Sequence, residues 1–171
     1  MFTKHSFKIA LLGISLLALA GLTSCGPQET ELSFETIERN DSYSAEEGYG
    51  GLEPCVVLVT TRQEIDHLEG LIRQTSLDQL AELDFQQYFA IAVFRGAQAT
   101  SGYDVIVERV ARRGDKIVIY AQFWEPSPHY AVFDAETSPY HIIKVRRSDG
   151  VSTQAELVLQ SQLVTPTPPS H

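Results

Sequence analysis

The stretch Tyr103–Glu125, YDVIVERVARRGDKIVIYAQFWE, decides the fold of this chain. Two runs rich in β-branched and aromatic residues, Tyr103–Val110 and Lys116–Glu125, flank the turn Arg112-Arg113-Gly114-Asp115. Gly114 supplies the positive φ that a tight turn needs, so the stretch predicts an antiparallel β-hairpin. Apolar residues occupy both alternating faces of the second run, which indicates that both faces are at least partly covered.

Further strands are expected on both sides of this hairpin. Leu32–Glu38 alternates apolar and polar residues, as a half-buried strand does. Cys55–Thr60 is a short apolar run that predicts a buried strand, and Gln87–Phe94 and Tyr140–Val145 predict two further strands. Leu157–Leu159 is interpreted as a last short strand or a helix end.

One main helix is expected after the strand that begins at Cys55. Thr61-Arg62-Gln63-Glu64 has the capping-box pattern, and a stripe of apolar residues at helical spacing follows it as far as Ile72. A second short helical piece is predicted over Leu77–Leu83. The sequence therefore predicts a single α+β domain over Leu32–Val164, mostly an antiparallel sheet with one main packed helix at Thr61–Ile72.

The N-terminus has the form of an export signal. Lys4 and Lys8 precede an uncharged apolar run, Ile9–Gly21, which is too short to span a bilayer comfortably. Leu22-Thr23-Ser24-Cys25 follows and resembles the lipobox of bacterial lipoproteins. The resemblance implies cleavage before Cys25 and acylation of its sulfur with chains such as palmitate. The alternative is an ordinary secretory signal with a chance cysteine.

The lipobox resemblance sets the expected organisation and location of the chain. Residues 1–24 are the signal peptide, 25–31 a lipidated tether, 32–164 the folded domain, and 165–171 a proline-rich disordered tail. The mature protein is expected in the bacterial cell envelope, attached to a membrane by its lipid anchor. Gly26 rather than Asp after the cysteine resembles the outer-membrane sorting pattern of some diderm bacteria, whereas a monoderm host would leave the protein on its cell membrane.

The charge of the chain excludes two classes of partner. The chain has 13 Lys and Arg against 22 Asp and Glu, and the expected signal removes Lys4 and Lys8 but no acidic residue, which leaves a mature charge of −11. A nucleic-acid binder needs a basic patch, so no nucleic acid is expected as a partner. Attraction to anionic lipid is equally unfavourable, and membrane attachment must come from the acyl chains.

Candidate chemistry is absent from the sequence pattern. Cys55 is the one cysteine besides the expected anchor, and a structural thiol at the start of a strand is favoured over a nucleophile. His67, His129 and His141 lack metal-ligand spacing, no GxSxG motif is present, and the carboxylates are scattered. We therefore expect no catalytic residue, no metal and no cofactor, and the chain is not predicted to be an enzyme.

Aromatic residues near the hairpin are the candidates for a binding surface. Trp124 and Tyr130 lie beside Pro126 and Pro128, where a strand leaves the sheet, and exposed aromatics there would be contact anchors. Phe123 and Phe133 are expected in the core. The candidate partner-binding residues are Tyr103, Trp124, Tyr130 and Tyr140.

The stretch from Asp84 to Val145 is similar to the C-terminal domain of the PrcB family. The similarity rests on Asp84-Phe85, on Phe94-Arg95-Gly96 at the end of a strand, on Thr100-Ser101-Gly102-Tyr103, and on Ser138-Pro139-Tyr140 after a proline-containing loop. The family comprises bacterial lipoproteins and secreted proteins named after a subunit of a spirochaete surface protease complex. Within the motif, Tyr103 and Tyr140 are expected first of all to pack as a structural pair.

The resemblance implies an accessory role rather than a catalytic one. The leading hypothesis is a non-catalytic, lipid-anchored module that binds an envelope or secreted protein such as a protease. The alternative is a lipoprotein that binds a small molecule or a glycan through its aromatic loop. A stoichiometric protein partner in native membranes favours the first hypothesis, and a deep aromatic-lined pocket without such a partner favours the second.

Overall fold

The computed structural model describes residues 28–129 and 131–164, and strands predominate within them. The helical segments are the 3₁₀ helix η1 (Arg62–Leu68), the α-helix α1 (Gln74–Ala81) and the 3₁₀ turn η2 (Arg147–Asp149). The strands are β1 (Glu29–Leu32), β2 (Phe34–Asn40), β3 (Cys55–Val59), β4 (Tyr88–Phe94), β5 (Asp104–Arg113), β6 (Lys116–Glu125), β7 (Tyr140–Arg146) and β8 (Gln154–Val164).

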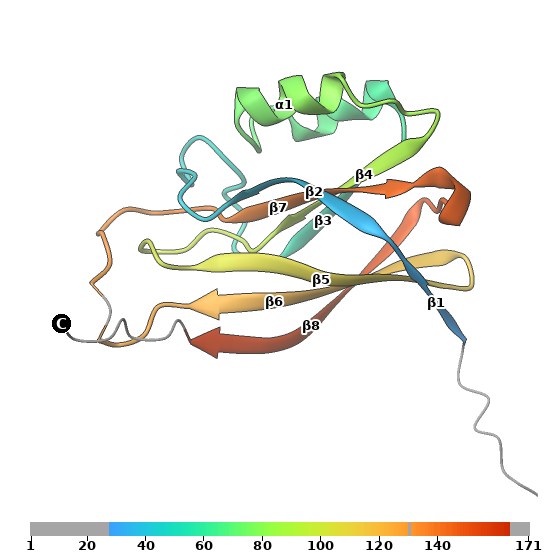
Figure 1. Cartoon of the computed structure of the whole chain (residues 1–171). Coiled ribbons are helices and arrows are strands. Elements are labelled where there is room, and N and C mark those ends of the chain that lie inside the picture. Colours follow the sequence, from blue (N-terminus) through green and yellow to red (C-terminus); the bar gives the residue numbers. More distant parts are fainter. Residues whose placement is uncertain (1–27, 130, 165–171) are drawn as a thin grey trace, which may run out of the picture.

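The strands form two four-stranded sheets that lie face to face (Figure 1). The hairpin sheet has the order β1-β5-β6-β8, and the covered sheet has the order β2-β7-β4-β3. Neighbouring strands are antiparallel except for β6 and β8, which run parallel. The predicted hairpin is confirmed as β5 and β6, and its turn contains Gly114 at φ 63°.

One short segment near the N-terminus contributes a strand to each of the two sheets. Leu32 ends β1 opposite Val110 of β5, and Phe34 begins β2 opposite Val145 of β7. Ser33 alone separates the two strands. The strand predicted over Leu32–Glu38 therefore breaks at Ser33, where the chain passes from the hairpin sheet to the covered sheet.

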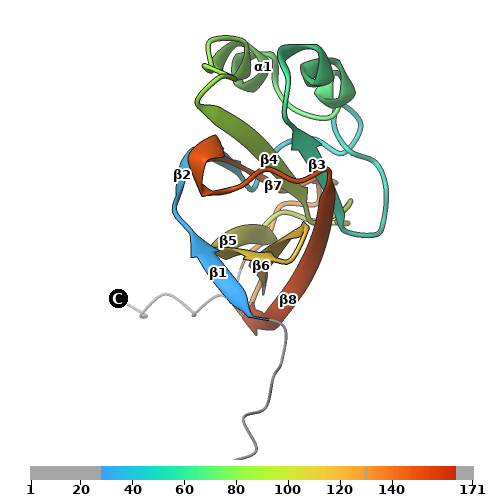
Figure 2. The same cartoon turned by 90° about the vertical axis from the view of Figure 1, so that its right-hand side faces the viewer.

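The core has two parts because the covered sheet is buried on both faces. On β4, alternate side chains point to opposite faces, and every residue from Phe89 to Phe94 is fully buried. Phe89, Ile91 and Val93 join the main cluster between the sheets. Ala90, Ala92 and Phe94 belong to a second cluster with Leu68 of η1 and Leu80 of α1, and Figure 2 shows these helical segments stacked on the covered sheet.

The predicted α+β class is wrong, because the described fold is mostly β. The longest helix, α1, has eight residues, whereas β5, β6 and β8 have ten or more each. The main helix predicted over Thr61–Ile72 is only the 3₁₀ helix η1. The backbone leaves the helical conformation at Glu69, whose ψ is 131°, and Gly70 at φ 69° continues this turn before the last two apolar residues of the stripe. Those residues still pack on the sheet, but from an irregular turn.

Two further expectations differ from the structure in extent. The short strand or helix end expected at Leu157–Leu159 is β8, an eleven-residue strand. β1 begins at Glu29, inside the range 25–31 expected as a tether. The expected signal peptide 1–24, the lipidation site Cys25, the tail 165–171 and the candidate residue Tyr130 lie outside the described residues.

Candidate functional site

Strand register brings three connecting segments to one end of the two sheets. Tyr140 lies opposite both Asn40 and Phe94, and Phe94 lies opposite Cys55. Asp104 and Trp124 are likewise opposite each other in the hairpin sheet. The segments that follow or precede these residues meet at the left of Figure 1. We call the described residues of these three segments the loop end: 41–54, 95–103, and 126–139 without residue 130.

Tyr140 is a core residue that ties one of these segments to the covered sheet. Its side chain is fully buried, and its ring contacts Tyr43 edge-on at 5.7 Å and Phe94 at 6.1 Å between centroids. Tyr49 in turn lies 5.2 Å from Phe94. Tyr140 thus packs with Tyr43 and Phe94 rather than with Tyr103. It holds residues 41–54 in place and offers no surface to a partner.

The hydroxyl of Tyr140 lies in a polar network beneath α1. It is 3.1 Å from Ser76 Oγ, and it donates to Glu38 Oε1 at 3.4 Å. The backbone N–H of Arg73 donates to the hydroxyl at 3.4 Å, and Ser76 Oγ donates to Glu38 Oε2. Burial raises the pKa of Tyr140 above its usual range. The network therefore joins the start of α1 to β2 and β7.

Buried Arg95 and half-buried Tyr103, both in the family motif, form a second contact. The guanidinium of Arg95 lies 4.9 Å from the ring centroid of Tyr103 and 4.8 Å from that of Phe123. Its Nη2 is 3.4 Å from Glu125 Oε1, and its Nη1 donates to the carbonyl of Asp104 at 3.4 Å. Only 4% of Arg95 is exposed, and burial lowers its pKa. Tyr103 is therefore occupied by an internal contact.

Trp124 is half-buried near the end of β6, opposite Asp104 of β5. Among the described residues, no partner lies within hydrogen-bond distance of its buried Nε1. The three described candidates therefore have different surroundings and do not form one surface: Tyr103 contacts Arg95, Tyr140 lies in the core, and Trp124 is half-buried on β6.

The exposed apolar residues of the loop end are different from the predicted ones. Leu52 is 79% exposed, Val132 39% and Phe133 80%. The expectation that Phe133 belongs to the core is wrong, whereas Phe123, at 4% exposure, is confirmed there. Exposed large apolar side chains that gather at one end of a protein are typical of contact surfaces.

Backbone hydrogen bonds hold the segment that carries Phe133. The N–H of Phe133 donates to Ser101 Oγ at 2.8 Å, and its carbonyl accepts from the N–H of Ser101 at 3.1 Å. Gln98 and Thr137 exchange backbone bonds of 2.8 and 2.9 Å nearby. The Phe133 ring thus projects from an anchored backbone.

Leu52 is held by the neighbouring segment. The N–H of Ala97 donates to the carbonyl of Gly51 at 2.8 Å. A Cβ atom at Gly96 would lie 2.5 Å from the carbonyl oxygen of Leu52, so the two backbones can approach this closely only with glycine at position 96. Arg95-Gly96 of the family motif therefore positions an exposed leucine.

The histidines and the cysteine that could act as metal ligands or catalytic groups do not form a cluster in the described residues. His67 and His129 are exposed, Cys55 is a half-buried free thiol at the start of β3, and His141 is buried between the sheets. Nowhere in residues 28–129 and 131–164 do three His, Cys, Asp or Glu side chains gather as metal ligands. No helix in the same ranges combines the length and the apolar character needed to cross a membrane.

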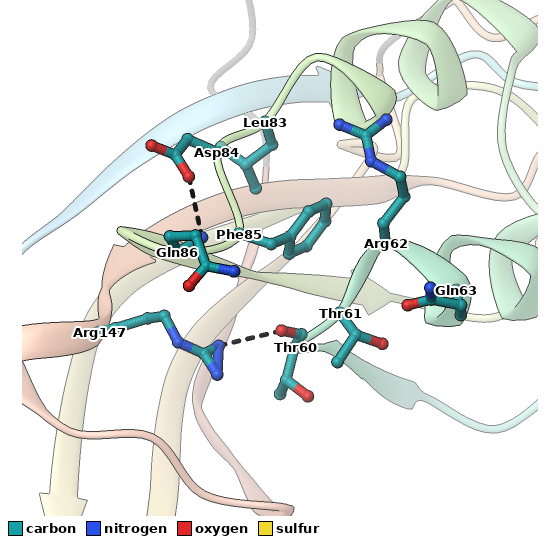
Figure 3. A pocket seen from close by; sticks show the side chains of 9 residues that line it. All are labelled: Thr60, Thr61, Arg62, Gln63, Leu83, Asp84, Phe85, Gln86 and Arg147. Carbon is teal, nitrogen blue, oxygen red and sulfur yellow. Dashed lines mark hydrogen bonds between the residues drawn. The ribbon is translucent and has the colours of Figure 1, made fainter.

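A polar pocket of about 490 Å³ lies at the opposite end of the sheets (Figure 3). Its lining includes Asp84, Phe85 and Arg147, and neither histidine nor cysteine contributes to it. Asp84 accepts from the N–H of Gln86 at 2.9 Å, which lowers its pKa, and Arg147 donates to the carbonyl of Thr60 at 2.9 Å. These contacts brace the connections between strands.

The fold and the loop end define a small two-sheet β protein that displays apolar side chains on anchored loops. Residues 89–146 match the family model described as PrcB C-terminal, and the prediction of a PrcB-family C-terminal domain is confirmed for them. The matched residues run from β4 to the end of β7 and include the motif residues Arg95 and Tyr103. No curated protein and no solved structure matches the chain.

Proposed function

We propose that this chain is a non-catalytic, lipid-anchored accessory protein of the bacterial envelope that binds another envelope or secreted protein. The observation that carries the proposal is the match of residues 89–146 to the PrcB C-terminal family. The partner expected from that family is a surface or secreted protease, which the chain would stabilise or help to assemble. The chain itself would have no peptidase activity.

The loop end supports a binding role for this domain. Leu52 and Phe133 are largely exposed although both are apolar, and the segments that carry them are fixed to the sheets. Burying such side chains against a partner is favourable, and little ordering entropy is lost because the backbone is already held.

The expected lipid anchor would direct the loop end away from the membrane. Glu29, the first residue of β1, lies opposite Arg113 beside the hairpin turn, at the end of the sheets opposite the loop end. Cys25 precedes Glu29 by four residues, which span at most about 14 Å. An acylated Cys25 would therefore hold the hairpin turn near the lipid and present the loop end to other envelope proteins.

Purification from the native membrane tests the proposal. The full chain with a C-terminal tag, cross-linked and recovered from host membranes, should bring down one stoichiometric protease, and a lipoprotein of similar abundance with the same tag should not. The level of that protease should fall when the gene is deleted. Recovery of no stoichiometric protein, or peptide hydrolysis by the purified chain alone, would contradict the proposal.

A further inference from the structure

The exposed charged side chains of the loop end are all acidic. Six acidic residues belong to its segments, and all are exposed. None of them forms an ion pair within the described residues. The one Lys or Arg among its residues is Arg95, which is 4% exposed and held between two rings. The six acidic residues are Asp41, Glu46, Glu47, Glu53, Asp134 and Glu136.

Phe133 lies next to two of these carboxylates in the chain. Asp134 follows it directly, and Glu136 lies three residues on. Both carboxylates are exposed, and Phe133 is the most exposed large apolar side chain of the described residues, at 80%. An apolar anchor beside carboxylates is complementary to an apolar pocket beside cationic side chains.

We propose that the loop end docks onto a basic protein surface, with Phe133 in an apolar pocket of the partner lined at its edge by Lys or Arg. The inference rests on the proposed binding function and names the chemistry of its partner. A second copy of this chain is unfavourable as the occupant, because a symmetric contact would bring two sets of six carboxylates together. An anionic lipid surface is unfavourable for the same reason.

Electrostatic and apolar contributions to such docking are separable. The carboxylates would speed association and lower the dissociation constant at low ionic strength, where the Debye length is about 30 Å at 0.01 M against about 8 Å at 0.15 M. The Phe133 ring would act at short range, and its contribution would be insensitive to salt.

A displayed library of random peptides, selected on the purified full chain in detergent, tests this chemistry. The selected peptides should carry an aromatic or branched aliphatic residue next to Lys or Arg. Phe133→Ser should weaken the binding of a synthetic selected peptide at least tenfold. The matched control is Val151→Ser, which removes an apolar side chain that is 40% exposed in the loop before β8, and it should leave binding unchanged.

Salt dependence tests the charge separately. The double variant Asp134→Asn, Glu136→Gln should weaken binding at low salt and reduce its salt dependence, while circular dichroism shows both variants folded. Selection of peptides without basic residues, or full binding by Phe133→Ser, would overturn the inference. Should a protease still be recovered from native membranes in that case, the proposed function would stand and only the assignment of its surface would fall.

Discussion

His141 links the two sheets through its imidazole ring. The backbone N–H of Val107 donates to Nδ1 at 2.9 Å, so Nε2 carries the proton and donates to Thr36 Oγ1 at 2.8 Å. Val107 lies where the register of β5 and β6 shifts. Burial, with a smaller contribution from Arg39, lowers the pKa of His141 to about 4.

This pKa predicts a pH dependence of stability. An unfolded histidine titrates near 6.5, so between pH 6.5 and about 4 the unfolded chain gains a proton that the folded chain does not, and stability falls as pH falls through this window. The loss attributable to His141 is about 3 kcal/mol. In urea unfolding over this range, His141→Gln should show a shallower slope, and the exposed-site control His67→Gln should not. An unchanged slope in His141→Gln would contradict the assignment.

Gly96 offers a second test at the scale of one residue. Its φ is 98°, and a Cβ atom added there would lie 2.5 Å from the Leu52 carbonyl oxygen, so Gly96→Ala should cost about 2 kcal/mol or more. Gly114→Ala is the control, since φ is 63° but no atom lies within 4 Å of its Cβ position, and it should cost about 1 kcal/mol. Equal losses in urea unfolding would show that the contact with Leu52 is unimportant.

Phe133 shows why sequence patterns miss such surface residues. Aromatic side chains are buried more often than not, so the core is the default expectation. In a strand, alternation would correct that default, but the segment between Pro128 and Pro139 has no period to read. The usable signal is composition: Phe133 precedes Asp134 and Glu136 in a proline-bracketed loop.

At the scale of elements, β1 depends on one charged side chain. Glu29 accepts from the Tyr120 hydroxyl at 2.6 Å, from Arg113 Nε at 2.9 Å and from Arg109 Nη1 at 3.0 Å. The bond from Tyr120, followed by that from Arg113, lowers the pKa of Glu29 to about 2. These bonds fix the four-residue β1 at the edge of the hairpin sheet, beside β5.

Removing this carboxylate should loosen β1 locally. In Glu29→Ala, amide hydrogen exchange of Thr30 and Leu32 should accelerate, whereas β4 should keep its protection because it lies in the core. Glu31→Ala removes an exposed carboxylate from the same strand and is the matched control. Equal exchange in the two variants would show that the Glu29 network does not hold β1.

Some strands can be predicted because the residues that specify them lie within the strand or in its adjoining turns, and others cannot. β3, β4, β7 and the β5–β6 hairpin are predictable because apolar runs and turn residues lie within each segment. The parallel pairing of β8 with β6 is not predictable from a local pattern, because β7 lies between these two strands in the chain. The stripe after Thr61 has helical spacing, but the spacing does not reveal that the backbone leaves the helical conformation at Glu69 and Gly70.

At the scale of the molecule, the division into two sheets could not be read from the sequence. It depends on the change of sheet at Ser33 and on pairings such as β1 with β5, which join distant segments. The alternation of Leu32–Glu38 looks the same whether the strand stays in one sheet or passes between two.

Membrane attachment is a prediction about the whole molecule that rests on Cys25. Mass spectrometry of the mature N-terminus should find an acylated Cys25, and Cys25→Ala should release or mislocalise the protein while circular dichroism stays unchanged. Two or three acyl chains bind firmly where one binds only marginally. An unmodified mature terminus at another residue, or a variant that stays membrane-bound, would contradict the lipid anchor.

The most direct test of partner binding through the loop end is site-specific photo-cross-linking in host cells. A photoreactive phenylalanine analogue is placed at Phe133 and, in a control chain, at Val151 on the loop before β8. We predict a discrete adduct with one envelope or secreted protein from position 133, weakened by added salt, and none from position 151. An adduct from position 151 alone, or from neither position, would contradict it.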